Sequence, residues 1–298
     1  MITKTWHGCV VVIPVGPKAE LVFLNDTLRS VFAYCAPGCK IVLIDNTEAG
    51  LDRGALRGGE NIDILRCLRD PAARPLHGGL YLNLSRAFAH ALAHYDFAVL
   101  LRLDDDALLV GAGADRQAAA VFGAQPDIGC LGSYRLTCTG AVRDFSPARR
   151  ILRREVSLRG ALRDRARWRI LRHLRRLARY HGYLDGEHCL GGAVFFSREC
   201  IARFAALGFL ERLELRRSNL GEDHIFSLMV KAAGLELADF ATDGKPLGLA
   251  WQGLPASPEH LLRMGKTIVH SVKGHGAMDQ GALRAEFRRL RLGVAGRR

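Results

Sequence analysis

The segment "FAVLLRLDDDALLVG", residues 97–111, ends an apolar run with three consecutive aspartates. The apolar part has the length and continuity of a buried strand. In an extended segment Asp104 and Asp106 project to one side and Asp105 to the other. Carboxylates on one side repel each other unless a cation lies between them, and Mg²⁺ and Mn²⁺ favour such oxygen ligands. The triplet therefore indicates either a divalent metal site or an exposed acidic turn.

The elements that must position this triplet alternate between strand-like and helix-like runs, the pattern of βαβ units around a mainly parallel sheet. In the first half we expect strands at 9–15, 40–46, 61–68 and 97–104, and helices at 19–35, 80–95 and 115–123. In the second half we expect strands at 128–136, 191–197 and 235–240, and helices that begin near Arg198 and at Glu222. Ligands of open α/β sheets bind beyond the carboxyl ends of the strands, so Asp45 and the triplet are expected to face one cleft.

Residues 78–106, "GGLYLNLSRAFAHALAHYDFAVLLRLDDD", resemble the central segment of family 2 glycosyltransferases, which have the nucleotide-sugar-binding fold called GT-A. In that family an arginine-containing helix and an aspartate precede a strand that ends in D-x-D, and Arg86 and Asp96 stand at the first two positions here. "VVVIPVGPKAE" resembles the family's opening strand, with Pro14, and "IVLIDNTEAG" places Asp45 in the nucleobase-contacting position. Two departures are "IPVG" for Ile-Pro-x-Tyr-Asn and Ala87 for the helix asparagine.

The second half carries further matches to the same family. "LGGAVFFSREC" resembles its glycine-rich acceptor-side strand, with Gly191 and Gly192, and residues 208–234 resemble its segment that leads into a Glu-Asp helix. The resemblance implies that Asp223 is the catalytic base and that Glu222 lies on the acceptor side. Many enzymes of this fold complete the metal shell with a histidine near the C-terminus. We expect His270 in that role, with His275 as the alternative.

The resemblance implies a GT-A α/β fold and a metal-dependent, inverting glycosyltransferase. Asp104, Asp106 and His270 would hold Mn²⁺ or Mg²⁺. The nucleotide diphosphate sugar, with a UDP-sugar favoured, would contact the residues Pro14, Asp45, Arg86, Asp104, Asp105 and Lys273. The acceptor would supply a hydroxyl group, on a cell-surface glycan or on a lipid-linked or phosphorylated molecule. Single-sugar transfer is expected because the Q-x-x-R-W signature of processive synthases is absent.

Length and charge suggest one domain with appendages. The 298 residues are 49% hydrophobic, which is ample for one core. We expect a transferase domain at 1–278, which includes a basic helical insert at 149–181, and a basic C-terminal helix or tail at 279–298. No signal peptide or membrane-spanning run is evident, so a cytoplasmic location is expected, peripheral at the inner face of the membrane if the insert binds lipid.

The basic insert is the most unusual segment. Thirteen arginines stand there against Glu155 and Asp164, within a chain of formal net charge +13. Read as one helix, its apolar stripe would contain Leu162, Ala166, Ile170, Leu174 and Leu177. The stripe fits either a helix on an anionic membrane surface or a solvated hairpin packed on the core. Nucleic-acid binding is not expected, because no recognition motif accompanies the arginines.

Two other functions remain open. A sugar nucleotidyltransferase would share the fold class, but it normally needs a G-x-G-x-R loop after the first strand, and "PVGPKAE" lacks one. A basic lipid- or nucleic-acid-binding protein on a degenerate transferase fold would not need acidic groups at Asp104, Asp106 and Asp223. We therefore favour the glycosyltransferase.

Overall fold

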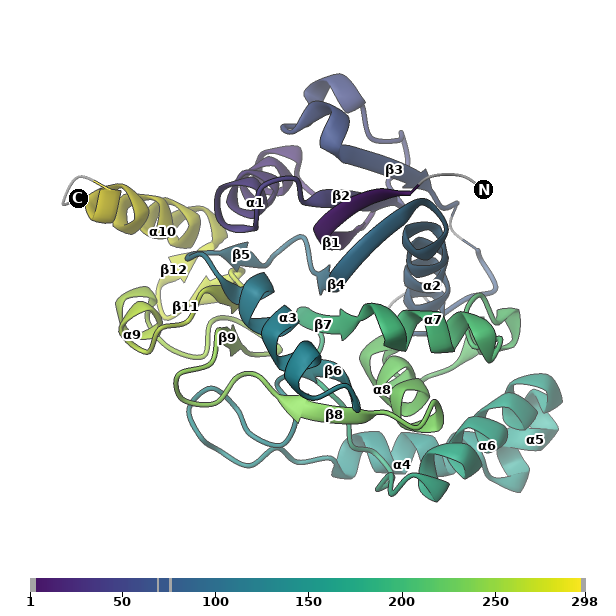
Figure 1. Ribbon diagram of the computed structural model, residues 1–298. Helices are drawn as coiled ribbons and strands as arrows, with labels where there is room; N and C mark the ends of the chain where they lie inside the picture. The colour runs from purple at the N-terminus through teal and green to yellow at the C-terminus, as the bar shows by residue number, and fades with distance from the viewer. Residues whose placement is uncertain (1–3, 69, 75–76, 296–298) are drawn as a thin grey trace.

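The computed structural model describes residues 4–68, 70–74 and 77–295, built around a seven-stranded sheet of order β3-β2-β1-β4-β7-β6-β8 (Figure 1). The strands are β1 (Thr5–Val15), β2 (Lys40–Asp45), β3 (Ile62–Arg66), β4 (Tyr95–Leu103), β6 (Ile128–Gly132), β7 (Ala193–Ser197) and β8 (Glu236–Asp239). β7 runs antiparallel to β4 and β6, whereas the other pairs are parallel. The expected α/β class, with a mostly parallel central sheet flanked by helices, is confirmed.

Helices cover both faces of this sheet, and alternation along β1 decides which residue meets which helix. Val10 and Val12 belong to one apolar cluster with α2 (Gly78–His94), α7 (Arg198–Ala206) and α8 (Glu222–Ala232). Val11 and Ile13 belong to a second cluster with α1 (Leu21–Tyr34) and α3 (Ala114–Ala124) on the opposite face. The sheet is buried on both sides, which explains its nearly uninterrupted apolar strands.

A second, three-stranded sheet of order β5-β10-β9 follows the carboxyl end of β4, where the aspartate triplet lies. Its strands are β5 (Leu108–Leu109), β9 (Leu247–Leu249) and β10 (Ile268–His270), and a short hairpin of β11 (Gly274–His275) and β12 (Met278–Asp279) follows. β5 comes directly after the aspartate triplet and pairs antiparallel with β10, with Val269 opposite Leu108. This pairing brings the end of β10 to the triplet. Sequence analysis did not foresee it, because strands of two or three residues carry no periodic signal.

The C-terminal region adds α9 (Pro258–Arg263) and α10 (Gln280–Ala295). Leu283 and Phe287 of α10 are fully buried in a third apolar cluster together with Leu261 of α9. The Arg284 guanidinium, 2% exposed as a residue, donates to Asp26, to Thr27 and to the main-chain carbonyl of Asp105. The helical part of the expected 279–298 segment therefore packs against the rest of the chain. The division at 278 stays a prediction, and residues 296–298 lie outside the described residues.

The basic insert forms α4 (Ser146–Glu155), α5 (Leu158–Arg163) and α6 (Arg165–Tyr180), which lie beside α8 (Figure 1). The single stripe expected from the sequence is wrong at its start, since Leu162 is 88% exposed and Ala166 is also exposed. The reason is a helix break at Asp164, whose side chain caps α6 by accepting from the Arg167 amide.

The rest of the stripe is buried. Ile170, Leu171, Leu174 and Ala178 enter the main apolar cluster, and Leu177 packs against it partly buried. The apolar face of α6 is thus covered by the core, as the hairpin interpretation requires. Binding of the insert to an anionic membrane stays a prediction that would have to use its arginines and the exposed Leu158 and Leu162. Within the described part of the chain, no helix combines the length and apolar character needed to cross a bilayer.

Candidate active site

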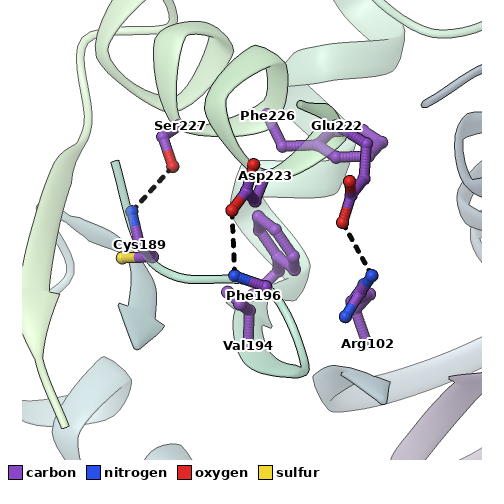
Figure 2. Close-up of a pocket in the computed structure, with 9 residues that line it drawn as sticks. Arg102, Cys189, Val194, Phe196, Glu222, Asp223, Phe226 and Ser227 are labelled. Atoms are coloured by element: carbon purple, nitrogen blue, oxygen red, sulfur yellow. Dashed lines mark hydrogen bonds and ion pairs between the residues drawn. The ribbon is translucent and has the colours of Figure 1, made fainter. Parts of the chain in front are cut away.

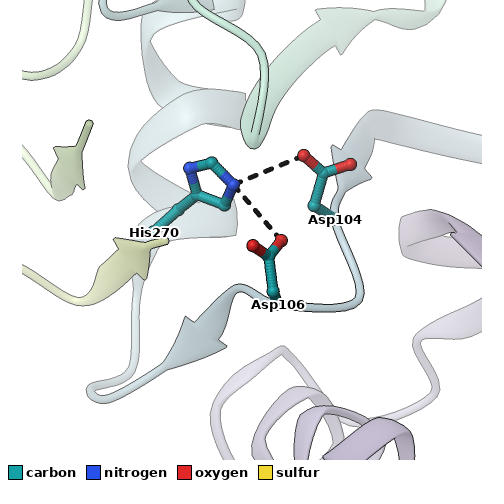
Figure 3. A group of neighbouring side chains, drawn as sticks. All are labelled: Asp104, Asp106 and His270. Atoms are coloured by element: carbon teal, nitrogen blue, oxygen red, sulfur yellow. Dashed lines mark ion pairs between the residues drawn. The ribbon is translucent and has the colours of Figure 1, made fainter. Parts of the chain in front are cut away.

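The end of β4 and the end of β10 bring Asp104, Asp106 and His270 together, with one ligand atom of each within 4.8 Å of the others (Figure 3). His270 Nε2 lies 3.4 Å from an Asp104 oxygen and 3.2 Å from an Asp106 oxygen. Asp105 takes no part in this cluster, as expected, but the expected reason is wrong, because residues 104–107 form a turn closed by the Ala107 amide and the Asp104 carbonyl rather than an extended segment. Two carboxylates and one imidazole form a donor set that suits a divalent ion with further positions left for water or a ligand.

The orientation of His270 supports this interpretation. Its Nδ1 contacts the Ala250 carbonyl at 2.9 Å, so Nδ1 carries a proton and Nε2 is the atom turned to the carboxylates. Although burial acts to lower it, the pKa of His270 is raised to about 9 by Asp104 and Asp106. The two carboxylates thus attract positive charge to the place where a metal ion would be held. His275 lies apart, with its Nδ1 near the Leu254 carbonyl.

Lys273 and Asp105 complete the surroundings of the cluster. Asp106 accepts from the Ser271 hydroxyl at 2.7 Å, and the Lys273 ammonium lies 3.1 Å from the same oxygen. The Lys273 side chain is 67% exposed and can reach a ligand at the site. Burial, together with the charges of Asp104 and Asp106, raises the pKa of Asp105 to about 6. The raised pKa shows that a further negative charge is unfavourable at this turn.

The start of α8 presents the second pair of acids. Asp223 lies beside Glu222 at the start of α8 (Figure 2). It accepts from the Gly191 amide at 3.0 Å through one oxygen and from the His224 amide through the other. Burial acts to raise the pKa of Asp223, but His188 and these amides lower it, so the group is a carboxylate at neutral pH. Each oxygen keeps a lone pair, and the side chain is 18% exposed. Asp223 is therefore able to accept a proton from a bound hydroxyl group.

Glu222 has different surroundings. It is 7% exposed and pairs with the Arg102 guanidinium at 2.6 Å. Burial raises its pKa to about 8 although Arg102 opposes the change, and Asp223 adds to the rise. Its position on the acceptor side stays a prediction, but its bond to Arg102 makes it part of the wall rather than a free base.

Arg102, on β4, is the residue of this site that sequence analysis missed. Its guanidinium contacts Glu222 and, at 2.9 Å, Asp104, so it joins the two acidic groups. Its Nε and one terminal nitrogen are buried without a hydrogen-bond partner, an arrangement that is costly unless a ligand supplies an acceptor. The signal was present in the sequence as an arginine inside the buried run "VLLRLD".

The two glycines expected on the acceptor side join the Asp104, Asp106 and His270 cluster to Asp223. Gly191 bonds to Asp223, and the carbonyl of Gly192 accepts from the Asp104 amide at 2.8 Å. Gly192 has φ +97°, and a Cβ there would lie 2.5 Å from the His270 Nδ1. Only glycine fits this close approach. Beneath it, Arg102, Gly191, Glu222 and Asp223 line a cavity of about 10 Å³, room for about one water molecule.

The remaining residues expected to hold the donor lie on β1, β2 and α2. Pro14 pairs in register with Ile44 near the end of β1. Asp45 is 1% exposed, and its carboxylate accepts from the amides of Thr47 and Leu51, the Thr47 hydroxyl and Arg66. These four bonds organise the turn after β2. The direct contact of Asp45 with a nucleobase stays a prediction, and it requires one of these donors to be displaced.

Arg86 lies on α2 beside the Cys67 thiol, whose pKa it acts to lower against the effect of burial. A polar chain runs nearby from Asn83 to Asn46 at 2.9 Å and on to the Cys67 carbonyl. Arg86 has no carboxylate partner among the described residues. Its charge is therefore available to a ligand at the ends of β2 and β3.

No protein-family model and no curated protein matches this chain. Among solved structures, it is similar to a galactosyltransferase, LgtC, in complex with donor and acceptor sugar analogues, at 13% identity, with 95% of each chain covered and a TM-score of 0.48. It is also similar to the mannosyltransferase PcManGT from Pyrobaculum calidifontis in complex with GDP-Man and Mn²⁺. That match has 17% identity, covers 78% of this chain and 54% of the other, and has a TM-score of 0.40. Similarities at this level assign no activity to the chain.

Proposed function

We propose that this chain is a metal-dependent glycosyltransferase that moves one sugar from a nucleotide diphosphate sugar to a hydroxyl acceptor with inversion. The observation that carries the proposal is the juxtaposition of the Asp104, Asp106 and His270 cluster with Asp223, joined through Gly191 and Gly192. The cluster would hold Mn²⁺ or Mg²⁺, which supplies charge stabilisation to a diphosphate.

The chain's own residues divide the chemistry between them. Asp223 accepts the proton of the acceptor hydroxyl as the oxygen attacks the anomeric carbon from the face opposite the leaving group. The bond from that carbon to the diphosphate breaks, and the nucleoside diphosphate leaves with the electron pair. Arg86 and Lys273 add positive charge for the leaving diphosphate. Arg102 and Glu222 are buried beside Asp223, which limits the access of water to this side of the site.

Calorimetric titration with UDP and GDP, with Mn²⁺ or with EDTA, tests the proposal. We expect binding that requires the ion, because the diphosphate and the two carboxylates of the cluster otherwise repel each other. Equal affinities in EDTA would contradict the metal role. With a UDP-sugar as donor, release of UDP supports transfer, whereas release of pyrophosphate in the presence of a nucleoside triphosphate and a sugar phosphate would favour a nucleotidyltransferase.

A further inference from the structure

A cavity of about 400 Å³ opens between the segment after β3, the start of α6 and the residues that lead into α8. It is separate from the narrow cavity beside Asp223. Its lining consists of Pro71, Ala72, Ala73, Arg74, Arg163, Asp164, Arg167, Arg217 and Asn219. Four arginines therefore face one space, against a single carboxylate.

Three of these arginines have no internal counter-ion. Within the part of the chain that the structure describes, the guanidinium groups of Arg74, Arg163 and Arg217 make no hydrogen bond and no ion pair. The exception is Arg167, which is 7% exposed and pairs with the buried Glu155 at 2.8 Å. A terminal nitrogen of Arg167 also donates to the Arg217 carbonyl at 2.9 Å, which fixes the cavity wall.

The single carboxylate of the lining is already engaged. Asp164 caps α6 through the Arg167 amide. Three unpaired guanidinium groups around one space repel each other, so an anion there gains from all three. Guanidinium groups bind phosphate oxygens through paired, parallel hydrogen bonds, and more than one negative charge is needed to balance this set. The chemistry selects a phosphate or diphosphate group over a neutral sugar.

The cavity is close to the proposed acceptor side. Asn219 precedes Asp223 by four residues, so their Cα atoms are at most about 14 Å apart even in a fully extended chain. An acceptor of a few units spans that distance. We propose that this cavity binds a phosphate group of the acceptor at a distance from the hydroxyl that is glycosylated. The assignment of this group to the acceptor rests on the proposed function, whereas the anion site itself does not.

Titration with inorganic pyrophosphate in EDTA tests the site without any contribution from a metal ion. We expect the wild type to bind, and Arg163→Gln and Arg217→Gln each to weaken binding on the order of tenfold or more. Arg169→Gln is the matched control, because Arg169 is exposed on α6, does not line the cavity and removes the same charge. No binding by the wild type, or equal losses in all three variants, overturns the proposal.

A second measurement distinguishes the source of the phosphate and separates the two proposals. Glucose 1-phosphate in solution is compared with phosphatidylcholine vesicles that contain phosphatidic acid, and dependence on Arg163 in either arm supports the site and identifies its source. If binding depends on Arg163 in neither arm, the assignment of the phosphate group to the acceptor is contradicted. Mn²⁺-dependent UDP or GDP binding is expected to be unchanged in Arg163→Gln. If pyrophosphate binding depends on Arg163 but UDP and GDP do not bind, the transferase proposal is overturned and the anion site is still supported.

Discussion

The acidic site at the end of β4 and the basic insert are both concentrations of like charge, but they are built in opposite ways. At the site, Asp106 and Glu222 are buried, and Asp104 and Glu222 contact the same Arg102 nitrogen. In α6, by contrast, Arg169, Arg172 and Arg176 face solvent, while the opposite face of the helix is apolar and buried. Buried like charges are costly unless a counter-ion compensates them, whereas solvated charges cost little.

This difference teaches which charges to interpret as functional. Most arginines of the insert need no partner, because water screens them. Arg102 and the acidic cluster do need one, because burial removes that screening. Arg74, Arg163 and Arg217 are exposed, but their three unpaired charges converge on the cavity at the start of α6. Position and missing partners, rather than the number of charges, identify the sites.

The largest expected effect comes from removing one acidic group at a time. Asp223→Asn should lower turnover by about 10²–10⁴-fold with donor affinity kept, because the amide cannot accept the proton. Asp106→Asn should lose Mn²⁺-dependent nucleotide binding as well as turnover. Calorimetry and release of the nucleotide report the two quantities separately.

Glu222→Gln is the control for these two variants, since Glu222 pairs with Arg102 and is turned about 100° from Asp223 on the helix. It should lower turnover less than Asp223→Asn. If Asp223→Asn keeps near-normal turnover, the inverting mechanism with Asp223 as its base is wrong, and another group must accept the proton.

An intermediate effect is expected at Gly192, where no charge is changed. The Cβ of Gly192→Ala would collide with His270, so Mn²⁺ affinity should fall about 10-fold or more, the order found when groups that orient a metal ligand are lost. Gly140→Ala is the matched control, because Gly140 also has positive φ, at +81°, but has open space around it. Both variants should lose thermal stability from backbone strain, and Gly192→Ala should lose more because its Cβ also collides with His270. If Gly192→Ala and Gly140→Ala bind Mn²⁺ with equal affinity, His270 is not a ligand of the metal ion.

The smallest functional effect is expected within the insert, where the two faces of α6 can be compared directly. Leu174→Ala should lower the free energy of unfolding by about 2–5 kcal/mol, because Leu174 is fully buried. Arg169→Gln and Arg176→Gln should change it by no more than about 0.5 kcal/mol. Urea denaturation of the three variants measures both. Similar losses on the two faces would mean that the arginines are structural, contrary to the comparison.

The sequence predicted the parts of the molecule that carry periodic signals. The strands around Val12 and Leu101 and the helices after them were expected from apolar runs, and they alone place Asp104 and Asp106 at a strand end. His270 was expected from its position near the C-terminus, but β5 and β10, which bring it to the aspartates, are too short to predict. Leu162 was misplaced because Asp164 was not interpreted as a helix cap.

Charge balance in three dimensions could not be predicted. Arg102 has its meaning only because β4 and α8 place Asp104 and Glu222 on either side of it. Likewise, Arg74 and Arg217 are far from Arg163 along the chain, and only the packing of the Leu213–Arg217 turn against α6 and α2 brings them to one cavity. Contacts between residues that are far apart in the sequence set these local electrostatic fields. The order of charges along the chain therefore does not predict them.

The bond from Arg284 to the Asp105 carbonyl has a consequence for the way the protein is made. A ribosome adds about 5–20 residues per second, so the aspartate turn emerges roughly 10–40 s before the arginine that braces it. When the turn emerges, the nascent chain has β1 to β4 but neither β10 nor α10. Newly made chains therefore bring His270 to the aspartates only after β10 has been synthesised, long after the turn itself.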